Sequence, residues 1–436
     1  MKKTLLSMLV GFSMTSSAFA EDLYQIYQQA LQNDPTTLRA QANKDAAYSG
    51  ISLSQASLLP QISLSLQADR FNGDRHSDSN DMTLELRQSI FDWSNWKNMG
   101  RAELVASQAD ANYGLAKQDL ILRTVNAYFD VLQAQDDLAF SQAEKRAIER
   151  QLEQTKQRFE VGLTAITDVH EAQAQFDNAV ASEISAQNNV EINLEALREI
   201  TGNYYSDISV LNTETFSASM PAPSDIGSWV STAEDRNLQL LAAKIGVDIS
   251  QEDIEIANTG HYPSVSLYGR YNSNDTTGAS SDAALETDNN ERFNTSYVQL
   301  SVSVPIYQGG SVSAQVEQAR HSFVATSEDR ERVHRSVVRN VRSNYFDVTA
   351  AISRIKALNQ AVVSAESALK ATEAGFEVGT RTIVDVLNST RNLYDAKRNL
   401  SRARYNYVLS VLGLKLAAGT LNEQDVIDIN NGLVSS

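Results

Sequence analysis

The chain carries the same eleven-residue phrase twice, and no other feature limits its possible folds as strongly. FEVGLTAITDV occupies residues 159–169, and FEVGTRTIVDV occupies residues 376–386. Seven of the eleven positions are identical, and the copies lie 217 residues apart in a chain of 436. A phrase that recurs at half the length of the chain indicates two copies of one structural unit.

Further matches extend this duplication. NAYFDV at 126–131 matches SNYFDV at 343–348, and LELRQSIF at 84–91 matches LSVSVPIY at 300–307. A solenoid is excluded, because its repeats are about 20–50 residues long. We therefore predict four parts after the N-terminal twenty residues: a first repeat at 21–202, a linker at 203–224, a second repeat at 225–415 and a C-terminal segment at 416–436.

Residues 1–20 have the pattern of a secretory signal peptide. Lys2 and Lys3 precede an apolar stretch, and Ala18 and Ala20 are the small residues of a cleavage site. An N-terminal membrane anchor is the alternative, but the apolar run is far shorter than the ~20 residues that a spanning helix needs. We expect an exported protein that begins at Glu21.

The composition excludes several classes of function. The formal net charge is −17, whereas nucleic-acid-binding surfaces are basic. The chain has no cysteine, so it cannot form disulfides or carry a lipid on cysteine. The histidines are scattered without the spacing of a metal site: His76, His170, His261, His321 and His334. Because no catalytic motif or phosphate-binding loop accompanies them, we expect no enzyme activity, no metal and no cofactor.

Each repeat contains two segments in which apolar and polar residues alternate. This period of two predicts strands at about 61–71 and 82–92, and at about 263–272 and 297–307. Polar loops are expected at 72–81 and 272–296. The strands have about the length that crosses a bilayer when tilted, and their polar faces suit an aqueous lumen. An ordinary β-sandwich is the alternative, but it does not explain the long helices that flank each strand pair.

The remaining segments have the periodicity of long helices. A heptad seam in the second repeat consists of Val337, Val341, Asn344, Val348, Ala351, Ile355, Leu358 and Val362. The run from about 94 to 160 contains no proline and predicts a helix roughly 100 Å long. Helices of this length indicate an elongated helical structure rather than a globular core.

The duplicated phrase lies where each heptad pattern breaks. Gly162 and Gly379 follow long helical stretches, and new heptad runs begin at about Ile166 and Ile383. Glycine often ends a helix because it adopts a positive φ without strain. We therefore predict one helical hairpin in each repeat, with tips at about 160–167 and 377–384.

Four strands cannot close a transmembrane barrel. An open sheet edge in lipid leaves backbone groups unpaired, and bacterial outer-membrane barrels begin at eight strands. We therefore expect an oligomer, and this argument alone permits a dimer, a trimer or a tetramer.

At these residues the sequence resembles the outer-membrane efflux protein (TolC) family. The likeness rests on VGLTAITDV at 161–169, VGTRTIVDVL at 378–387 and GTLNEQD at 419–425, and it covers essentially the whole chain after the signal peptide. The resemblance implies an α+β membrane protein that forms a homotrimer. A twelve-stranded outer-membrane β-barrel, with four strands per chain, would continue into a long periplasmic α-helical barrel. A mixed α/β equatorial belt would come from 203–224 and 416–436.

The resemblance also implies a function. Members of the family act as passive exit ducts that work with a periplasmic adaptor (membrane fusion) protein and an inner-membrane pump or exporter. They carry drugs, toxic small molecules or proteins to the exterior. Two other functions stay open: a general diffusion porin, which would have no helical gate, and a structural coiled-coil scaffold across the periplasm, which would need no lumen.

The resemblance implies a polar gate at the tips. In the family, an Arg and a Tyr of the second tip link to an Asp and a Thr of the first. Arg381 matches the Arg, and Asp168 and Thr167 match the Asp and the Thr. Phe376 stands at the Tyr position, and a phenyl ring cannot donate a hydrogen bond. One link is therefore expected to differ here. Ordinary solvated charges are the plainer interpretation of Arg381 and Asp168.

The resemblance also implies a constriction ring and a docking surface. Asp385 matches the first of two aspartates in the family's constriction, and Asn388 stands at the second. A trimer would then present three carboxylates instead of six and attract cations less strongly. The residues expected to contact the adaptor are Val161, Gly162, Leu163, Val378, Gly379 and Thr380.

Overall fold

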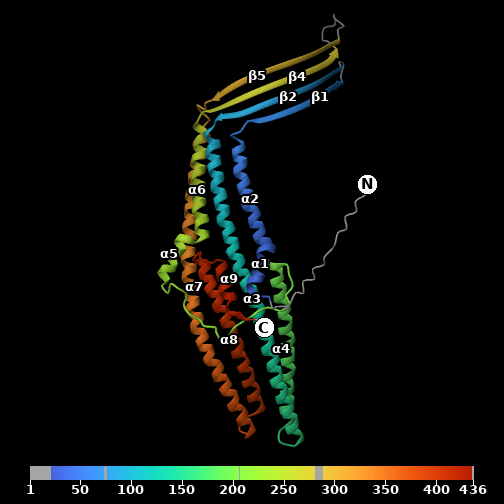
Figure 1. Ribbon diagram of the computed structural model, residues 1–436, viewed down its shortest axis with the longest axis vertical. Coiled ribbons are helices and arrows are strands. Elements are labelled where there is room, and N and C mark those ends of the chain that lie inside the picture. The colour runs from blue at the N-terminus through green and yellow to red at the C-terminus, as the bar shows by residue number, and fades with distance from the viewer. Residues whose placement is uncertain (1–20, 73–75, 206, 280–287, 435–436) are drawn as a thin grey trace, which may run out of the picture. The chain divides into compact units, whose positions relative to one another are not determined.

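The computed structural model describes residues 21–72, 76–205, 207–279 and 288–434, and the signal peptide expected at residues 1–20 lies outside them. The elements in chain order are α1 (Leu23–Asn33), α2 (Pro35–Ala56), β1 (Gln61–Asn72), β2 (His76–Phe91), α3 (Trp93–Glu160), α4 (Ile166–Thr201), β3 (Val210–Leu211), α5 (Ile226–Arg236), α6 (Leu238–Asn258), the 3-10 turn η1 (Thr259–His261), β4 (Ser264–Ala279), β5 (Asp288–Ser303), α7 (Ser311–Glu377), α8 (Ile383–Ala417), α9 (Glu423–Asn430) and β6 (Leu433–Val434) (Figure 1). The predicted combination of long helices with a four-stranded antiparallel sheet is confirmed.

Two compact units divide the chain, and they do not coincide with the two repeats. Of the described residues, those within 21–38, 116–236 and 338–434 belong to unit 1, and those within 39–115 and 237–337 belong to unit 2. Each unit therefore takes corresponding pieces of both repeats. The helices α3 and α7, of 68 and 67 residues, continue from unit 2 into unit 1.

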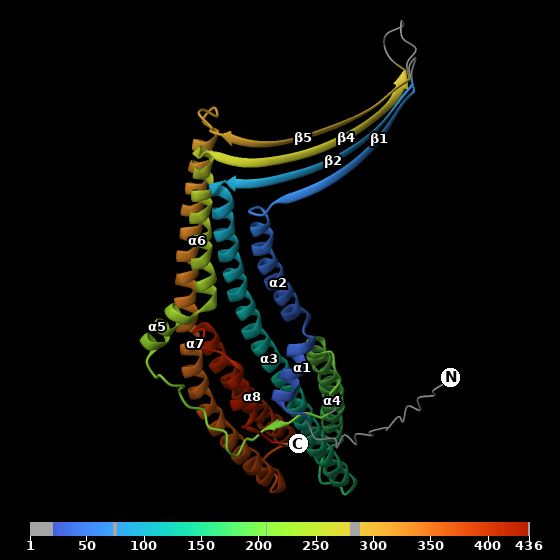
Figure 2. The ribbon, with the colours of Figure 1, turned by 45° about the horizontal axis from the view of Figure 1, so that its top comes forward.

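Unit 2 contains the four-stranded sheet. Its strand order is β1-β2-β4-β5, and all neighbouring strands are antiparallel, as Figure 2 shows. The pair β1–β2 comes from the first repeat and the pair β4–β5 from the second, and β2 joins β4. Among the described residues, β1 and β5 each pair along one side only.

The sheet has one apolar and one polar face. Ile62, Leu64 and Leu66 of β1 are 70%, 60% and 73% exposed within the single chain. On the opposite face, Ser63 pairs with Glu85, and Arg270 lies 3.6 Å from the Glu85 carboxylate. A large exposed apolar face indicates a surface that contacts lipid or another protein. In the described part of the chain, no helix is long and apolar enough to cross a membrane.

The strands are longer than the alternation predicted, so the loops expected at 72–81 and 272–296 are wrong over most of their length. The strand β2 begins at His76, and β4 continues to Ala279. Backbone pairing does not require apolar side chains, so polar residues extend both hairpins beyond the apolar band. A cross-strand ion pair, Arg70–Asp78 at 3.0 Å, supports this extension.

The fourth strand also ends earlier than expected. The alternation predicted a strand to about 307, but β5 ends at Ser303. Pro305 lies two residues beyond Ser303 and cannot donate a backbone hydrogen bond, which explains the early end.

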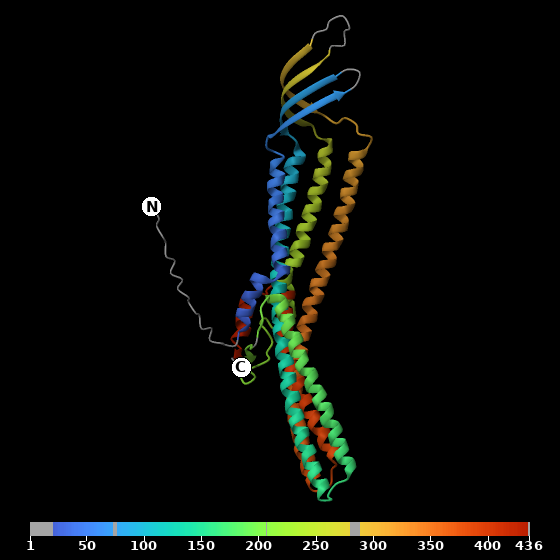
Figure 3. The same ribbon diagram turned by 90° about the vertical axis from the view of Figure 1, so that its right-hand side faces the viewer.

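Unit 1 contains the two helical hairpins, α3–α4 and α7–α8. Their turns lie at the same end of the unit (Figures 1 and 3). Tyr128 and Phe129 of α3 are buried together with Leu23 of α1 and Leu197 of α4. Four residues of the predicted seam of α7 are buried, namely Val337, Val341, Val348 and Ile355, and the other four are half-buried.

The linker between the repeats meets the C-terminal segment on unit 1. The strands β3 and β6 pair antiparallel, with Val210 opposite Val434. The hydroxyl of Tyr24 in α1 donates to Glu423 in α9 at 2.9 Å. Residues from 203–224 and 416–436 are thus joined by a small sheet.

Candidate functional site at the hairpin tips

The first tip turns with a motif that requires glycine. Gly162 has a φ of +77°, in the left-handed region. The Leu163 amide donates to the Arg158 carbonyl at 2.8 Å, and the Gly162 amide donates to the Phe159 carbonyl at 2.9 Å. These are the two hydrogen bonds of a Schellman motif, which ends a helix.

The second tip repeats this geometry. Gly379 also has a φ of +77°. The Thr380 amide donates to the Gly375 carbonyl at 2.8 Å, and the Gly379 amide donates to the Phe376 carbonyl at 3.1 Å. The duplicated phrase therefore encodes one turn twice.

The acidic residue of the first tip bonds within its own hairpin. Asp168 lies in the first turn of α4, where a carboxylate interacts favourably with the helix N-terminus. The hydroxyl of Thr164 donates to it. Thr167 is exposed, and its side chain has no hydrogen bond within the described residues.

The acidic residue of the second tip belongs to a helix cap. Thr382 and Asp385 form a capping box at the start of α8. The backbone amide and the hydroxyl of Thr382 each donate to one Asp385 oxygen at 2.9 Å. These bonds, followed by the charge of Arg381, hold the pKa of Asp385 below its usual range.

A glycine that the sequence did not single out positions Arg381. The Arg381 amide donates to the Gly375 carbonyl at 3.2 Å. A Cβ atom at Gly375 would lie 2.8 Å from Cγ of Arg381. Gly375 therefore leaves the space in which the Arg381 side chain crosses the end of α7.

The structure does not join the gate residues of the two tips within one chain. Among the described residues, no hydrogen bond or ion pair links Arg381 to Asp168. Nor does a hydrogen bond link Phe376 to Thr167. Both tips nevertheless lie at the same end of unit 1, as Figure 3 shows.

Phe376 makes a different contact between the hairpins. The guanidinium carbon of Arg158, near the end of α3, lies 4.5 Å from the centre of the Phe376 ring. This distance fits a cation–π interaction. A shallow pocket of about 370 Å³ surrounds the pair, lined by Gln154, Gln157, Arg158, Val161, Phe376 and Glu377. No local pattern in the sequence indicates this pair, because its members are distant along the chain.

Asn388 faces a basic neighbour. An Nη atom of Arg391 donates to Oδ1 of Asn388 at 2.5 Å. The second position of the predicted constriction therefore carries an amide bound to a guanidinium, whereas Asp385 carries a charge one turn earlier.

Apolar side chains project from both turns. Val161, Leu163 and Val378 are 69%, 73% and 75% exposed. Below the turns, an apolar cluster packs residues of both hairpins together, among them Ile148, Leu152, Ala172, Ile383 and Val386. The tips thus rest on a shared core and expose an apolar surface beyond it.

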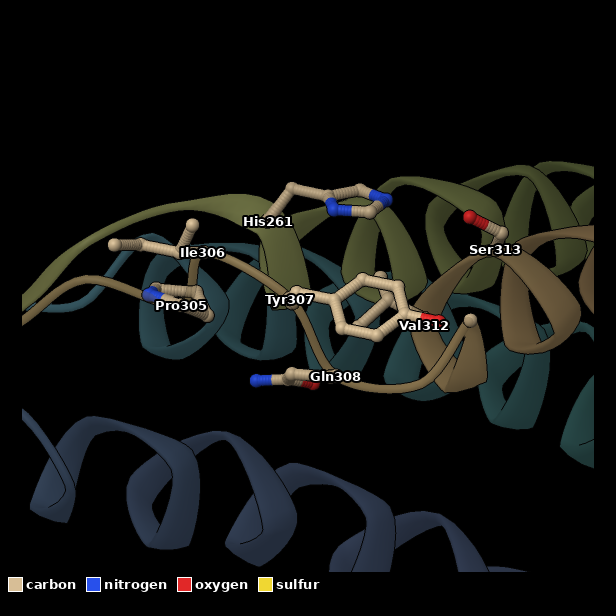
Figure 4. A pocket seen from close by; sticks show the side chains of 9 residues that line it. His261, Pro305, Ile306, Tyr307, Gln308, Val312 and Ser313 are labelled. Carbon is tan, nitrogen blue, oxygen red and sulfur yellow. The ribbon is translucent and has the colours of Figure 1, made fainter.

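Unit 2 has a separate, smaller pocket of about 110 Å³ beside the β5–α7 connection. His261, Pro305, Tyr307 and Val312 are among its lining residues (Figure 4). The residues that line this pocket do not form a cluster of metal-ligating side chains. Over the described ranges as a whole, no group of three or more acidic, histidine or cysteine residues is arranged to hold a metal ion.

Comparison with known families decides the assignment. The model of the family described as "Outer membrane efflux protein" matches residues 26–203 and again 229–420. The chain belongs to the outer membrane efflux protein family. The two matched ranges correspond to the two repeats of this chain.

Individual members of the outer membrane efflux protein family are similar over nearly the whole chain. Outer membrane protein TolC of Vibrio cholerae is 48% identical over 424 residues, which cover 97% of this chain and 96% of that protein. Outer membrane protein TolC of Escherichia coli K12 is 46% identical, with 99% of this chain and 89% of that protein covered. The outer membrane channel CmeC of Campylobacter jejuni, at 16% identity, has the same fold with a TM-score of 0.77 over 100% of this chain and 98% of CmeC.

Membership in the outer membrane efflux protein family establishes the general function. The chain is an efflux channel of the outer membrane that extends into the periplasm, and its role is transport rather than catalysis. The predicted family, function class and location are confirmed.

Proposed function

We propose that three copies of this chain form one continuous exit duct that is closed at its periplasmic end by the hairpin tips. The observation that carries this proposal is the sheet of unit 2. Its apolar face is exposed, and its strands β1 and β5 each pair along one side only among the described residues. In a membrane such edges must be paired, and pairing β5 of one copy with β1 of the next closes a barrel.

A trimer gives a barrel of twelve strands, which lies within the range of bacterial outer-membrane barrels. The polar face of the sheet, with Glu85 and Arg270, would then line an aqueous lumen. The exposed apolar face would contact lipid. The linker and the C-terminal segment, joined by β3 and β6, would form a belt around the helices.

The gate is proposed to act between copies. Arg381 is exposed, and within one chain it forms no ion pair with Asp168 in the described residues. The two tips of each chain lie at one end of unit 1, so a ring of three chains brings the second tip of one copy beside the first tip of its neighbour. An Arg381–Asp168 link across that boundary would hold the ring closed, with Thr167 beside it.

The constriction would lie just above this gate. Asp385 supplies a carboxylate whose pKa is lowered, and Asn388 contributes no carboxylate. Three carboxylates in the ring should attract cations less strongly than six.

Opening is proposed to be driven by partners rather than by chemistry in the duct. The exposed Val161, Leu163 and Val378 give each tip an apolar surface on which a periplasmic adaptor protein can dock, and Gly162, Gly379 and Thr380 lie between them. Docking would favour an open state in which each hairpin moves as a unit, so that α4 and α8 swing outward and α8 separates from α3. The adaptor would connect the duct to an inner-membrane pump or exporter, and drugs, toxic small molecules or proteins would pass to the exterior.

The experiment that tests the gate measures the entry of a large antibiotic that does not normally cross the outer membrane. We expect cells that carry Arg381→Ala to become more sensitive to it, because the closed ring loses a link. Arg335→Ala is the matched control, since Arg335 is an exposed arginine of α7 whose ion pair with Glu331 lies within one helix. Unchanged sensitivity in Arg381→Ala, with normal protein levels, would refute the assignment of Arg381.

A further inference from the structure

A band of ion pairs crosses all four long helices of unit 1 at a distance from the tips. The helix α3 supplies the adjacent residues Glu144 and Lys145, and α8 supplies the adjacent residues Lys397 and Arg398. These positions lie roughly 20–25 Å from the tip ends of their helices, at about 1.5 Å per residue. They are therefore separate from the gate residues.

Two of the ion pairs each hold one hairpin together. Lys145 of α3 donates to Glu183 of α4 at 2.8 Å. Lys397 of α8 lies 3.3 Å from Glu366 of α7. Both pairs join helices of the same hairpin, so they move with that hairpin.

A third ion pair joins one hairpin to the other. Arg398 of α8 bonds to Glu144 of α3, and it also donates to the Ser141 hydroxyl at 3.4 Å. The two charged side chains are only 18% and 12% exposed. Water screens such a pair much less than an exposed one.

A second connection between the hairpins lies one helical turn farther from the tips. Arg402 of α8 donates to Asp137 of α3 at 2.7 Å. The hydroxyls of Ser401 and Tyr405 both donate to Asp136. Burial, together with the Asp136 carboxylate, raises the pKa of Tyr405.

We propose that the α3–α8 pairs Glu144–Arg398 and Asp137–Arg402 form a second latch, which holds the two hairpins together above the tips and must break when the duct opens. This inference rests on the proposed function, in which α8 moves outward. Arg398 and Arg402 are then positioning residues for the gate, since they fix α8 against α3 without contacting cargo.

The physical basis is the difference between the closed and the open state. An interaction biases a conformational equilibrium only if it differs between the two states. The Arg398–Glu144 pair is made in the closed state and lost when α8 leaves α3. Opening therefore gives up an ion pair that water screens little where the two side chains lie against each other, and this loss opposes opening. The Lys397–Glu366 pair persists in both states and contributes no bias.

The test records single channels of the full-length protein in a planar bilayer. We expect Arg398→Gln to raise the open probability several-fold over wild type, because the link between the hairpins is lost. Lys397→Gln is the matched control: it removes a positive charge from the adjacent residue, and we expect wild-type behaviour. A charge exchange, Arg398→Glu with Glu144→Arg, should bring the open probability part of the way back to wild type, because it re-forms the link between the hairpins but places a second carboxylate beside Asp395, which pairs with Arg398 at 2.7 Å.

Other results would overturn the latch. Wild-type behaviour of Arg398→Gln would show that the pair is equally present in both states. An equal rise in Arg398→Gln and Lys397→Gln would show general loosening of the helices. Should Arg398→Gln fail to assemble, Arg402→Gln carries the same expectation at a more exposed pair, 47% and 22% exposed, and the absence of a rise there would refute the proposal.

The latch and the proposed gate can fail separately. Because Arg398 and Arg381 are more than about 20 Å apart along α8, their effects on the opening equilibrium should add in free energy. Suppose that wild type conducts, that Arg381→Ala raises the open probability and that Arg398→Gln does not. This result would support the duct and its gate and would refute the latch alone. A wild type without any conductance would refute the duct itself.

Discussion

At the scale of single residues, the tips depend on a few side chains that each have two roles. Asp385 caps α8 through Thr382 and carries the charge proposed for the constriction. Arg158 accepts the Leu163 amide through its carbonyl near the end of α3, and its guanidinium lies over Phe376 of the other hairpin. Where the family pattern has a tyrosine, this chain thus keeps a contact between the hairpins, but one that needs only an aromatic ring.

The Phe376 contact gives a prediction. Phe376→Ala removes both the ring below Arg158 and part of the apolar cluster that includes Ile383, so we expect the tips to loosen and the sensitivity to large antibiotics to rise. Loss of a cation–π contact and of buried apolar surface together is worth roughly 2–4 kcal/mol. Phe376→Tyr is the matched control, because it keeps the ring, and its sensitivity should not exceed that of wild type. A leak as large in Phe376→Tyr as in Phe376→Ala would contradict the role of the ring.

At the scale of whole elements, some parts of the fold follow from local rules and others do not. The proline-free run predicts the long helix α3, and a glycine with positive φ follows from the turn that each tip needs. The ends of the strands cannot be predicted from the alternation of apolar and polar residues. Residues 76–81 pair through their backbone although their side chains are polar. In α4 the buried positions at seven-residue spacing are the alanines Ala172, Ala179 and Ala186, which hydropathy alone does not distinguish from surface residues.

Contacts between elements were the hardest to foresee. Arg398 and Glu144 are 254 positions apart in the sequence. From the sequence alone, many other acidic residues could equally have been the partner of Arg398. The approach of Arg381 to Gly375 depends on the exact course of the turn. Candidate gate residues could therefore be named from the sequence by resemblance, whereas the partners that hold them in place required the structure.

The start of α8 gives a prediction about pH. The lowered pKa of Asp385 means that its carboxylate stays ionised at a pH at which an ordinary aspartate begins to take up a proton. We expect the preference of the channel for cations to persist from neutral pH down through the ordinary aspartate pKa of about 3.9, and to be lost only below it. Asp385→Asn should lower this preference at every pH. Asp177→Asn, at an exposed position of α4, should leave it unchanged.

A loss of the cation preference at a higher pH would contradict the role of Asp385. If the cation preference of wild type fell away well above pH 4, another group would control it. The cap also contributes to stability: because the folded pKa is lowered, this contribution is present above the ordinary aspartate pKa and is lost as the pH falls through the folded value.

At the scale of the whole molecule, the duplication explains why one chain supplies two strand pairs and two hairpin tips. Each repeat places its strands in unit 2 and its tip in unit 1, so one chain contributes twice to each part of the proposed ring. The family model matches once per repeat, which agrees with this division. The chain is an efflux channel of the outer membrane, and we propose that its path is closed at the hairpin tips.

The most direct test of a closure at the hairpin tips is the single-channel conductance in a planar bilayer. Wild type is compared with Arg381→Ala and with the control Arg335→Ala. A small conductance in wild type and in the control, which rises several-fold in Arg381→Ala, is the predicted result and would establish a pore closed at its hairpin tips. A large conductance in all three proteins would contradict a gate at the duplicated phrase, and no conductance in any of them would contradict the duct.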